Sequence, residues 1–198
     1  MKKLIIFLLV LLVAAGLGIS YYQSNSKLAN KPQKTETKLE VKKKSMIITS
    51  PAFKNNSKIP SKYTCDGKNI NPPLEFSDIP KETKSLVLII DDPDAPSKTW
   101  VHWVLYSIPP STAKIEENSD TGGIQGMTDF GKLGYGGPCP PPASPNRGES
   151  GTHRYFFKLY ALDTILDAPS GLTKQQVLEK VRDHVIEEAE LVGLYNRQ

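Results

Sequence analysis

The sequence predicts a mostly β domain preceded by an N-terminal hydrophobic segment. Sixteen of the 198 residues are proline, many in pairs or clusters that α-helices tolerate poorly. Several runs are instead rich in β-branched and aromatic residues and are separated by stretches of Gly, Pro, Asn and Asp, the usual pattern of strands and loops. Only one segment, near the C-terminus, carries clear helix signals. The length suits one domain with extensions.

The N-terminal 45 residues have the composition of a targeting segment followed by a linker. Lys2 and Lys3 precede an apolar run from Leu4 to Ile19, which is typical of a signal peptide or membrane anchor over residues 1–22. Residues 23–45 are mostly Lys, Thr, Glu and Asn, so we predict a basic disordered linker. Because the two lysines should stay inside, the domain over residues 46–198 is expected to be extracytoplasmic. It would be either membrane-anchored or, after cleavage, secreted or periplasmic.

The charge of the chain is unevenly distributed. Residues 1–45 contain nine lysines and two glutamates, a net charge of +7, whereas the whole chain carries +4. The domain from Met46 onward is therefore acidic, with 16 basic and 19 acidic residues. A domain of this charge lacks the basic surface that nucleic-acid binding requires, so we expect no nucleic-acid partner.

Four runs are predicted to be strands. A short one opens the domain, a continuous apolar run is typical of a buried strand, and two others are rich in aromatic and β-branched residues. In order they are Met46–Ser50, Ser85–Asp91, Trp100–Ile108 and His153–Leu162. The longest predicted loop spans Asn118–Gly137.

One helix is predicted near the C-terminus. Thr173 and Gln176 form a capping-box pattern, and Gly193 is a plausible stop. Between them, apolar residues keep helical spacing at Val177, Val181, Val185, Ala189 and Val192. His184 falls beside this apolar face, where we expect a structural or solvated role.

The two cysteines, Cys65 and Cys139, do not form a C-x-x-C or other metal-ligand spacing. Outside the cytosol they could form one disulfide, and closing so long a loop would stabilise the fold by about 4 kcal/mol. Two separate, partly buried thiols are the alternative.

Polar residues gather at the predicted strand ends. Asp92 and Asp94 follow the buried strand, and alternation along the last strand places His153 and Tyr155 on one face. The same alternation places His102 with Val104, Tyr106 and Ile108. Loops at strand ends commonly build sites on a rigid scaffold.

Three interpretations of these residues are open. Histidines charged by nearby carboxylates could bind an anion, helped by backbone N–H groups of the Gly134–Gly137 loop. His and Asp also bind zinc, although no ligand spacing supports a metal site. Acid–base or nucleophilic catalysis is the third interpretation, but no Ser or Cys stands in a recognisable nucleophile motif.

Taken together, the motifs resemble the phosphatidylethanolamine-binding protein family, and more closely its prokaryotic Raf-kinase-inhibitor-like branch. The resemblance covers residues 46–198. It rests on Tyr63–Gly67, Asn71–Leu74, Asp91–Pro96, Trp100–Trp103, Asp129–Lys132, Gly134–Pro141 and His153–Tyr155.

The resemblance implies two antiparallel β-sheets with a few peripheral helices, and an anion pocket for phosphate or phospholipid head groups. Carried over by position, the pocket residues are Asp92, Asp94, His102, Gly137, Pro138, His153 and Tyr155. The sequence departs from the eukaryotic pattern at Cys139, where a second proline usually stands, and in the longer loop Pro140–Ser150.

These observations predict a binding protein and not an enzyme, with no cofactor and no metal. The expected ligand is phosphate-like or of the phosphoethanolamine type, and the membrane is contacted through the N-terminal segment. The alternative is a regulator or inhibitor of a protease or kinase that acts through surface loops, including Pro140–Ser150. A phosphoester hydrolase is the third possibility.

Overall fold

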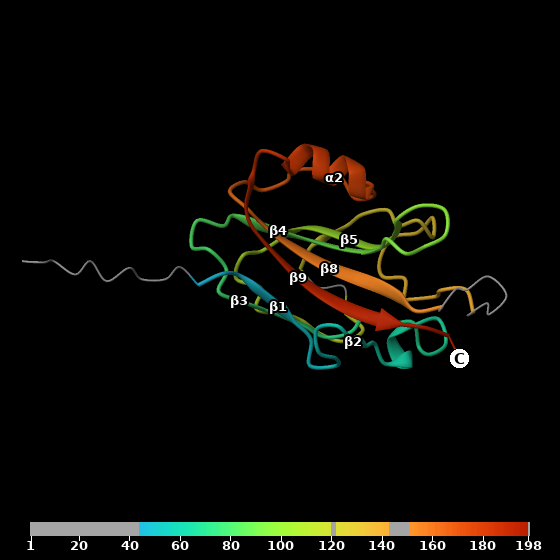
Figure 1. The fold of residues 1–198 in the computed structure, drawn as a ribbon. Helices are drawn as coiled ribbons and strands as arrows, with labels where there is room; N and C mark the ends of the chain where they lie inside the picture. The colour runs from blue at the N-terminus through green and yellow to red at the C-terminus, as the bar shows by residue number, and fades with distance from the viewer. Residues whose placement is uncertain (1–43, 120–121, 143–150, 198) are drawn as a thin grey trace, which may run out of the picture. The chain divides into compact units, whose positions relative to one another are not determined.

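The computed structural model describes residues 44–119, 122–142 and 151–197. In these ranges two β-sheets and one α-helix are stacked in layers, with the helix on the outer face of the larger sheet (Figure 1). The predicted mostly β fold with two sheets is confirmed. The predicted signal or anchor segment and nearly all of the predicted linker lie outside the described residues. No helix in the described ranges is long and apolar enough to cross a membrane.

The smaller sheet is antiparallel and has the strand order β1-β3-β6. Its strands are β1 (Ile47–Thr49), β3 (Leu74–Ser77) and β6 (Lys114–Ile115).

The larger sheet has the order β2-β9-β8-β4-β5-β7 and is antiparallel except for the β2–β9 pair. Its strands are β2 (Ser57–Lys58), β4 (Ser85–Asp92), β5 (Trp100–Ile108), β7 (Ile124–Gln125), β8 (His153–Leu162) and β9 (Val185–Tyr195). A 3-10 turn, η1 (Ser61–Tyr63), follows β2. The four predicted strands are thus confirmed as β1, β4, β5 and β8. Strand β7 lies within the predicted loop Asn118–Gly137.

Strand β4 is buried along its whole length because both of its faces are covered. Leu88 and Ile90 pack in the core between the two sheets, whereas Val87 and Ile89 pack in a second core under the helix. The apolar run of this strand is therefore the signature of a central strand with two buried faces. At its end the alternation directs neighbouring carboxylates, Asp91 and Asp92, to opposite faces.

The helix α2 (Lys174–Val181) begins where the sequence predicts. The Thr173 hydroxyl accepts a hydrogen bond from the Gln176 N–H, and the Gln176 side chain accepts one from the Thr173 N–H. Val177 and Val181 are buried against the larger sheet. Lys174 reaches the buried carboxylate of Asp91 in β4, which ties the start of the helix to the sheet.

The predicted end of the helix is wrong. The helix stops at Val181, and the segment expected to continue it is β9, which pairs with β8 along the whole of β8. The sequence from Val185 to Gly193 fits a period of two almost as well as one of 3.6, so its pattern is ambiguous. Pairing with the exposed edge of β8 satisfies the backbone groups of both strands and decides the outcome. His184 lies on the turn between helix and strand, where its Nδ1 contacts Asp163 at 2.8 Å on the surface.

Candidate functional site

The start of β8 places two polar residues above an apolar column. His153, Tyr155, Phe157, Leu159 and Ala161 are all buried, and the residues between them in the first part of the strand are more exposed. The shared face predicted from alternation is confirmed for this strand. From Tyr155 onward the column belongs to the core between the sheets, so the His153 ring stands at the edge of that core.

A β-bulge positions His102 on the neighbouring part of the sheet. Ile90 pairs with Trp103 and Asp91 with Val101, so His102 has no partner of its own on β4. The ring of His102 packs edge-on against the Tyr155 ring, with centroids 5.2 Å apart.

The face predicted for His102 is therefore wrong. Val104 and Tyr106 lie in the core under the helix, and His102 lies on the other side of the sheet with Tyr155. A bulge inserts one residue and reverses the alternation, and bulges often re-aim side chains near functional sites.

Asp92 and His153 form a buried pair that joins β4 to β8. The Asp92 Oδ2 atom lies 2.7 Å from the His153 Nδ1 atom, and the two side chains are 4% and 10% exposed. The other carboxylate oxygen accepts a hydrogen bond of 2.8 Å from the backbone N–H of Asp94. Because a carboxylate accepts, Nδ1 of His153 must carry the hydrogen, which leaves Nε2 for another partner.

His102 is held by a backbone carbonyl. Its Nδ1 atom lies 2.7 Å from the carbonyl oxygen of Gly136, and the residue is 3% exposed. Burial lowers the pKa of His102, and the Gly136 carbonyl and the charge of Asp92 counter this only in part. The ring is therefore uncharged more readily than a histidine in water.

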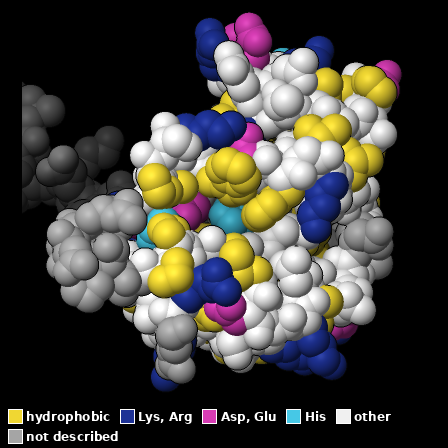
Figure 2. All heavy atoms as spheres, turned by 90° about the vertical axis from the view of Figure 1, so that its right-hand side faces the viewer, with side chains coloured by type: hydrophobic (Ala, Val, Ile, Leu, Met, Phe, Trp, Pro, Cys, Tyr) yellow, Lys and Arg dark blue, Asp and Glu magenta, His cyan; other side chains and the backbone are white. Residues whose placement is uncertain are grey.

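Both histidines line one pocket of about 300 Å³. Most of its wall is apolar, with the polar groups converging at one place, as is usual for small-molecule sites. Figure 2 shows histidine and acidic side chains in a hollow surrounded by hydrophobic side chains. The residues that line it are Asp92, Ala95, Pro96, Trp100, His102, Phe130, Cys139, Pro140, Pro141 and His153. They are called the pocket below.

Tyr155 contributes a buried hydroxyl next to these groups. The residue is fully buried and does not line the pocket, and its hydroxyl lies close enough to the Asp92 carboxylate for that group to act as its hydrogen-bond acceptor. Burial and then the nearby charge of Asp92 raise the pKa of Tyr155, so the hydroxyl stays protonated and can donate.

The Gly136–Gly137 turn is not the anion nest that the sequence suggested. The backbone N–H of Gly136 donates to the carbonyl of His102, and that of Gly137 donates to Asn69 Oδ1 at 2.7 Å. Both donors are therefore used inside the protein. At Gly137 a Cβ atom would lie 2.4 Å from the Tyr63 carbonyl oxygen, so only glycine allows this close approach.

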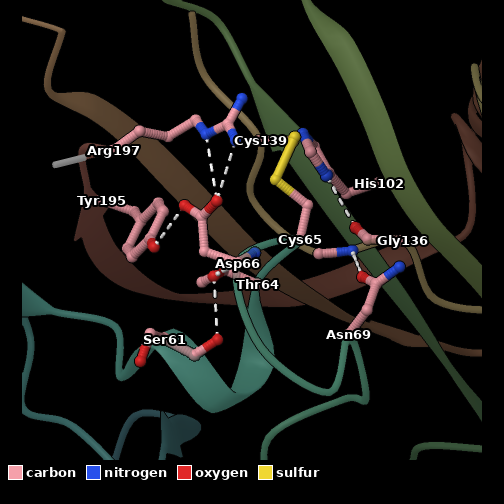
Figure 3. Close-up of a disulfide and its surroundings, with 11 residues drawn as sticks. Ser61, Thr64, Cys65, Asp66, Asn69, His102, Gly136, Cys139, Tyr195 and Arg197 are labelled. Atoms are coloured by element: carbon pink, nitrogen blue, oxygen red, sulfur yellow. Dashed lines mark hydrogen bonds and ion pairs between the residues drawn. A yellow bond between two sulfur atoms is a disulfide. The ribbon is translucent and has the colours of Figure 1, made fainter. Parts of the chain in front are cut away.

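A disulfide joins Cys65 to Cys139 across this close approach, which decides between the two alternatives left open above. The two Cα atoms are 5.4 Å apart and the residues are 74 positions apart in sequence. Next to it, the Cys65 N–H donates to the Pro138 carbonyl at 3.0 Å. Figure 3 shows the disulfide beside His102 and the Gly136 carbonyl. The disulfide thus fixes the segment that supplies Cys139, Pro140 and Pro141 to the pocket wall.

Comparison with known proteins places this chain in a family. A family model described as "Phosphatidylethanolamine-binding protein" matches residues 49–196. The chain belongs to the phosphatidylethanolamine-binding protein family.

Relatives in the family are similar over most of their length. A protein of Methanothermobacter thermautotrophicus named "UPF0098 protein" is 52% identical over 158 residues, which are 77% of this chain and 99% of that protein. The crystal structure of a putative phosphatidylethanolamine-binding protein homolog from Chlamydia trachomatis matches with a TM-score of 0.72 at 42% identity, over 78% of this chain and 99% of that one. Escherichia coli YbcL matches with a TM-score of 0.71 at 29% identity, over 78% and 100%.

In this member of the phosphatidylethanolamine-binding protein family, the predicted site residues occupy different positions around the pocket. Asp92, His102 and His153 line it, and Tyr155 lies behind His102 next to Asp92. Gly137 and Pro138 support the wall from behind, through the contacts to Asn69 and Cys65 described above.

Asp94 is not among the residues that line the pocket. Its carboxylate receives two hydrogen bonds from the Arg154 guanidinium, at 2.9 and 2.7 Å, and one from the Arg154 backbone N–H at 2.9 Å. These bonds lower the pKa of Asp94. The side chain therefore fixes the Asp92–Pro96 turn against β8, and its oxygens are already occupied by Arg154.

Sequence reasoning missed the apolar part of the pocket. Trp100 and Phe130 pack edge-on at 5.6 Å, and Phe130 also packs edge-on against His102 at 5.3 Å. The Asp129–Lys132 motif was a signal for Phe130, but nothing in the sequence shows that this loop reaches His102.

Residues 143–150 of the loop that the regulator hypothesis invoked lie outside the described residues. In the described part of the chain no group of three or more His, Cys, Asp and Glu side chains could hold a metal ion.

Proposed function

We propose that this chain is an extracytoplasmic binding protein whose pocket takes a small phosphate-like anion, including the phosphoethanolamine type of head group, and that it is not an enzyme. The observation that carries the proposal is the buried Asp92–His153 pair that lines the pocket. Burying charged and polar side chains such as these costs free energy that hydrogen bonds must offset.

The pair supplies one strong donor. With Nδ1 bonded to Asp92, the Nε2 atom of His153 is left for a ligand, and the doubly protonated ring would donate from it to an anion. The apolar wall limits water in the pocket, which strengthens each of these hydrogen bonds.

Two features support binding over catalysis. The disulfide occupies both cysteines, so neither supplies a thiolate nucleophile. The Asp92–His153 pair resembles a general-base dyad, but among the described residues none that lines the pocket is a serine or threonine that it could activate.

The disulfide also supports the extracytoplasmic part of the proposal. Disulfides persist mainly in oxidising compartments outside the cytosol. The basic start and apolar run of residues 1–22 point the same way.

We expect His153→Ala to weaken binding of inorganic phosphate and of O-phosphoethanolamine by about 10- to 100-fold, because a charge-assisted hydrogen bond contributes roughly 1.5–3 kcal/mol. Isothermal titration calorimetry of the full-length chain measures this. His184→Ala is the matched control, since His184 also pairs with an aspartate but lies outside the pocket. Equal affinities for wild type and His153→Ala would refute the assignment.

We expect alkaline phosphatase fused after Ser45 to be active in bacterial cells and β-galactosidase fused at the same point to be inactive, because only the former needs export. The opposite pattern would contradict an extracytoplasmic domain. Recovery of the full-length chain in the membrane fraction would then indicate an anchor, and a shortened soluble chain a cleaved signal.

A further inference from the structure

Strand β9 is paired along only part of its outer edge, the edge that faces away from β8. Strand β2 pairs with residues 193–194 near the end of β9. Just before them, the Val192 N–H donates to Asn55 Oδ1 at 2.8 Å, and the Val192 carbonyl oxygen accepts a hydrogen bond of 2.7 Å from the Asn56 N–H. The outer edge is therefore covered from Val192 onward.

The outer edge before Val192 is open. In a strand the backbone groups of alternate residues face the same edge, so those of Glu188 and Glu190 face the same way as those of Val192. Pairing with β8 is regular from residue 187 to residue 195, so no bulge changes this alternation. Among the described residues, nothing bonds to the backbone N–H and C=O groups of Glu188 and Glu190 on this edge. An open edge of this kind is a template for one more strand.

The same two residues place negative charge at the open edge. Their side chains are exposed. Lys158 of β8 stands opposite Glu190, but its ammonium lies 3.2 Å from the Asp91 carboxylate, and in the described part of the chain neither glutamate has an ion-pair partner. Burial and then the neighbouring carboxylates, of which Glu188 contributes most, raise the pKa of Tyr160 to about 12. An open hollow of about 260 Å³ at this edge is lined by Lys158, Tyr160, Glu188, Ala189 and Glu190.

These charges decide what can pair with the edge. A second copy of this chain that paired its own β9 with this one would bring glutamates against glutamates, and like charges on facing strands are destabilising. A strand with lysine or arginine at every second position would instead place its cations beside Glu188 and Glu190, because side chains on one face of a strand are two residues apart.

We propose that the open outer edge of β9 is a docking site for an extended basic segment of a partner protein, which adds to the larger sheet as a further strand. Backbone hydrogen bonds to Glu188 and Glu190 provide the affinity, and the two carboxylates select lysine or arginine at alternate positions. Neither residue lines the pocket, so this inference does not depend on the proposed function.

Hydrogen exchange measured by NMR on the full-length chain tests the site. The probe is a capped heptapeptide that alternates lysine and valine, and the control is a heptapeptide that alternates glutamate and valine. We expect a saturating amount of the lysine peptide to slow exchange of the Glu188 and Glu190 amide hydrogens by about tenfold or more, and the glutamate peptide to leave both rates unchanged.

Three results of that experiment would overturn the proposal. One is unchanged exchange at the two amides with the lysine peptide, and another is equal slowing by both peptides. The third is slow exchange at both amides before any peptide is added, since the edge would then already be covered within the chain or by a second copy.

The variant Glu190→Pro tests the backbone contribution. Proline removes the N–H that faces outward, and edge strands tolerate proline at positions whose N–H faces solvent. The bonds to β8 come from the residues on either side and are retained. We expect calorimetric titration to show that the lysine peptide binds this variant about 3- to 10-fold more weakly, the effect of one lost backbone hydrogen bond.

A double variant, Glu188→Gln with Glu190→Gln, tests the charges and decides the matter if Glu190→Pro does not fold. It keeps the backbone and the size of both side chains, so it should weaken binding of the lysine peptide about tenfold at low salt and reduce its salt dependence. Glu179→Gln, an exposed glutamate of α2, is the matched control and should leave the affinity unchanged. Unchanged affinity in the double variant would refute the selection of a basic partner.

Discussion

Replacing both Cys65 and Cys139 by serine is expected to lower the free energy of unfolding by about 4 kcal/mol, because the disulfide closes a long loop and restricts the unfolded chain. The expected loss is a large part of the stability of a domain this size. Urea denaturation of the oxidised wild type and of the double variant, followed by tryptophan fluorescence, measures the difference.

The same double variant should bind phosphate more weakly, since Cys139 and the two prolines after it form part of the pocket wall. Wild type reduced by an excess of a dithiol is the control, and it should match the double variant in stability. A reduced protein as stable as the oxidised one would show that the bond does not constrain the fold. Unchanged phosphate affinity in the double variant would show that the pocket wall is held by the other contacts of the Gly137 turn.

Asp92→Ala is expected to lower the free energy of unfolding by about 1–3 kcal/mol, the usual cost of leaving a buried hydrogen-bonding group without its partner. The substitution leaves the buried His153 without its acceptor and also removes the acceptor of the Asp94 backbone N–H. Chemical denaturation of the oxidised variant measures the loss.

Asp163→Ala is the matched control for that experiment. Asp163 also pairs with a histidine, but the two side chains are 51% and 45% exposed, so its loss should cost less than about 1 kcal/mol. A double-mutant cycle of Asp92→Ala with His153→Ala isolates the interaction between the two. A cost for Asp92→Ala no larger than for Asp163→Ala would argue that water reaches the pair and that it is not a desolvated donor.

Much of the site could be read from sequence because it lies on regular strands. His153 and Tyr155 share a face since β8 is uninterrupted at its start, and Asp92 follows a run whose burial is evident from its composition. The sequence identified His102 as a pocket residue, but alternation assigned its side chain to the wrong face of the sheet. The bulge that turns it depends on how β5 pairs with β4, which alternation in one strand cannot reveal.

The helix near the C-terminus shows the same limit for the fold. The capping box at Thr173 is a local interaction and was predicted correctly. The end of the helix was not, because residues 185–195 are compatible with either structure, and the free edge of β8 selects the strand. The choice depends on a partner more than twenty positions away in sequence.

By itself the sequence determined the class of fold, the strands that carry the site and the side chains that line its polar end. These follow from local composition, alternation and capping, which act within a few residues. The tertiary structure alone decided the Cys65–Cys139 bond, the occupation of both Gly136–Gly137 donors, and the turning of His102 toward Tyr155. Each depends on segments distant in sequence meeting at a few ångströms, and local patterns contain no information on that distance.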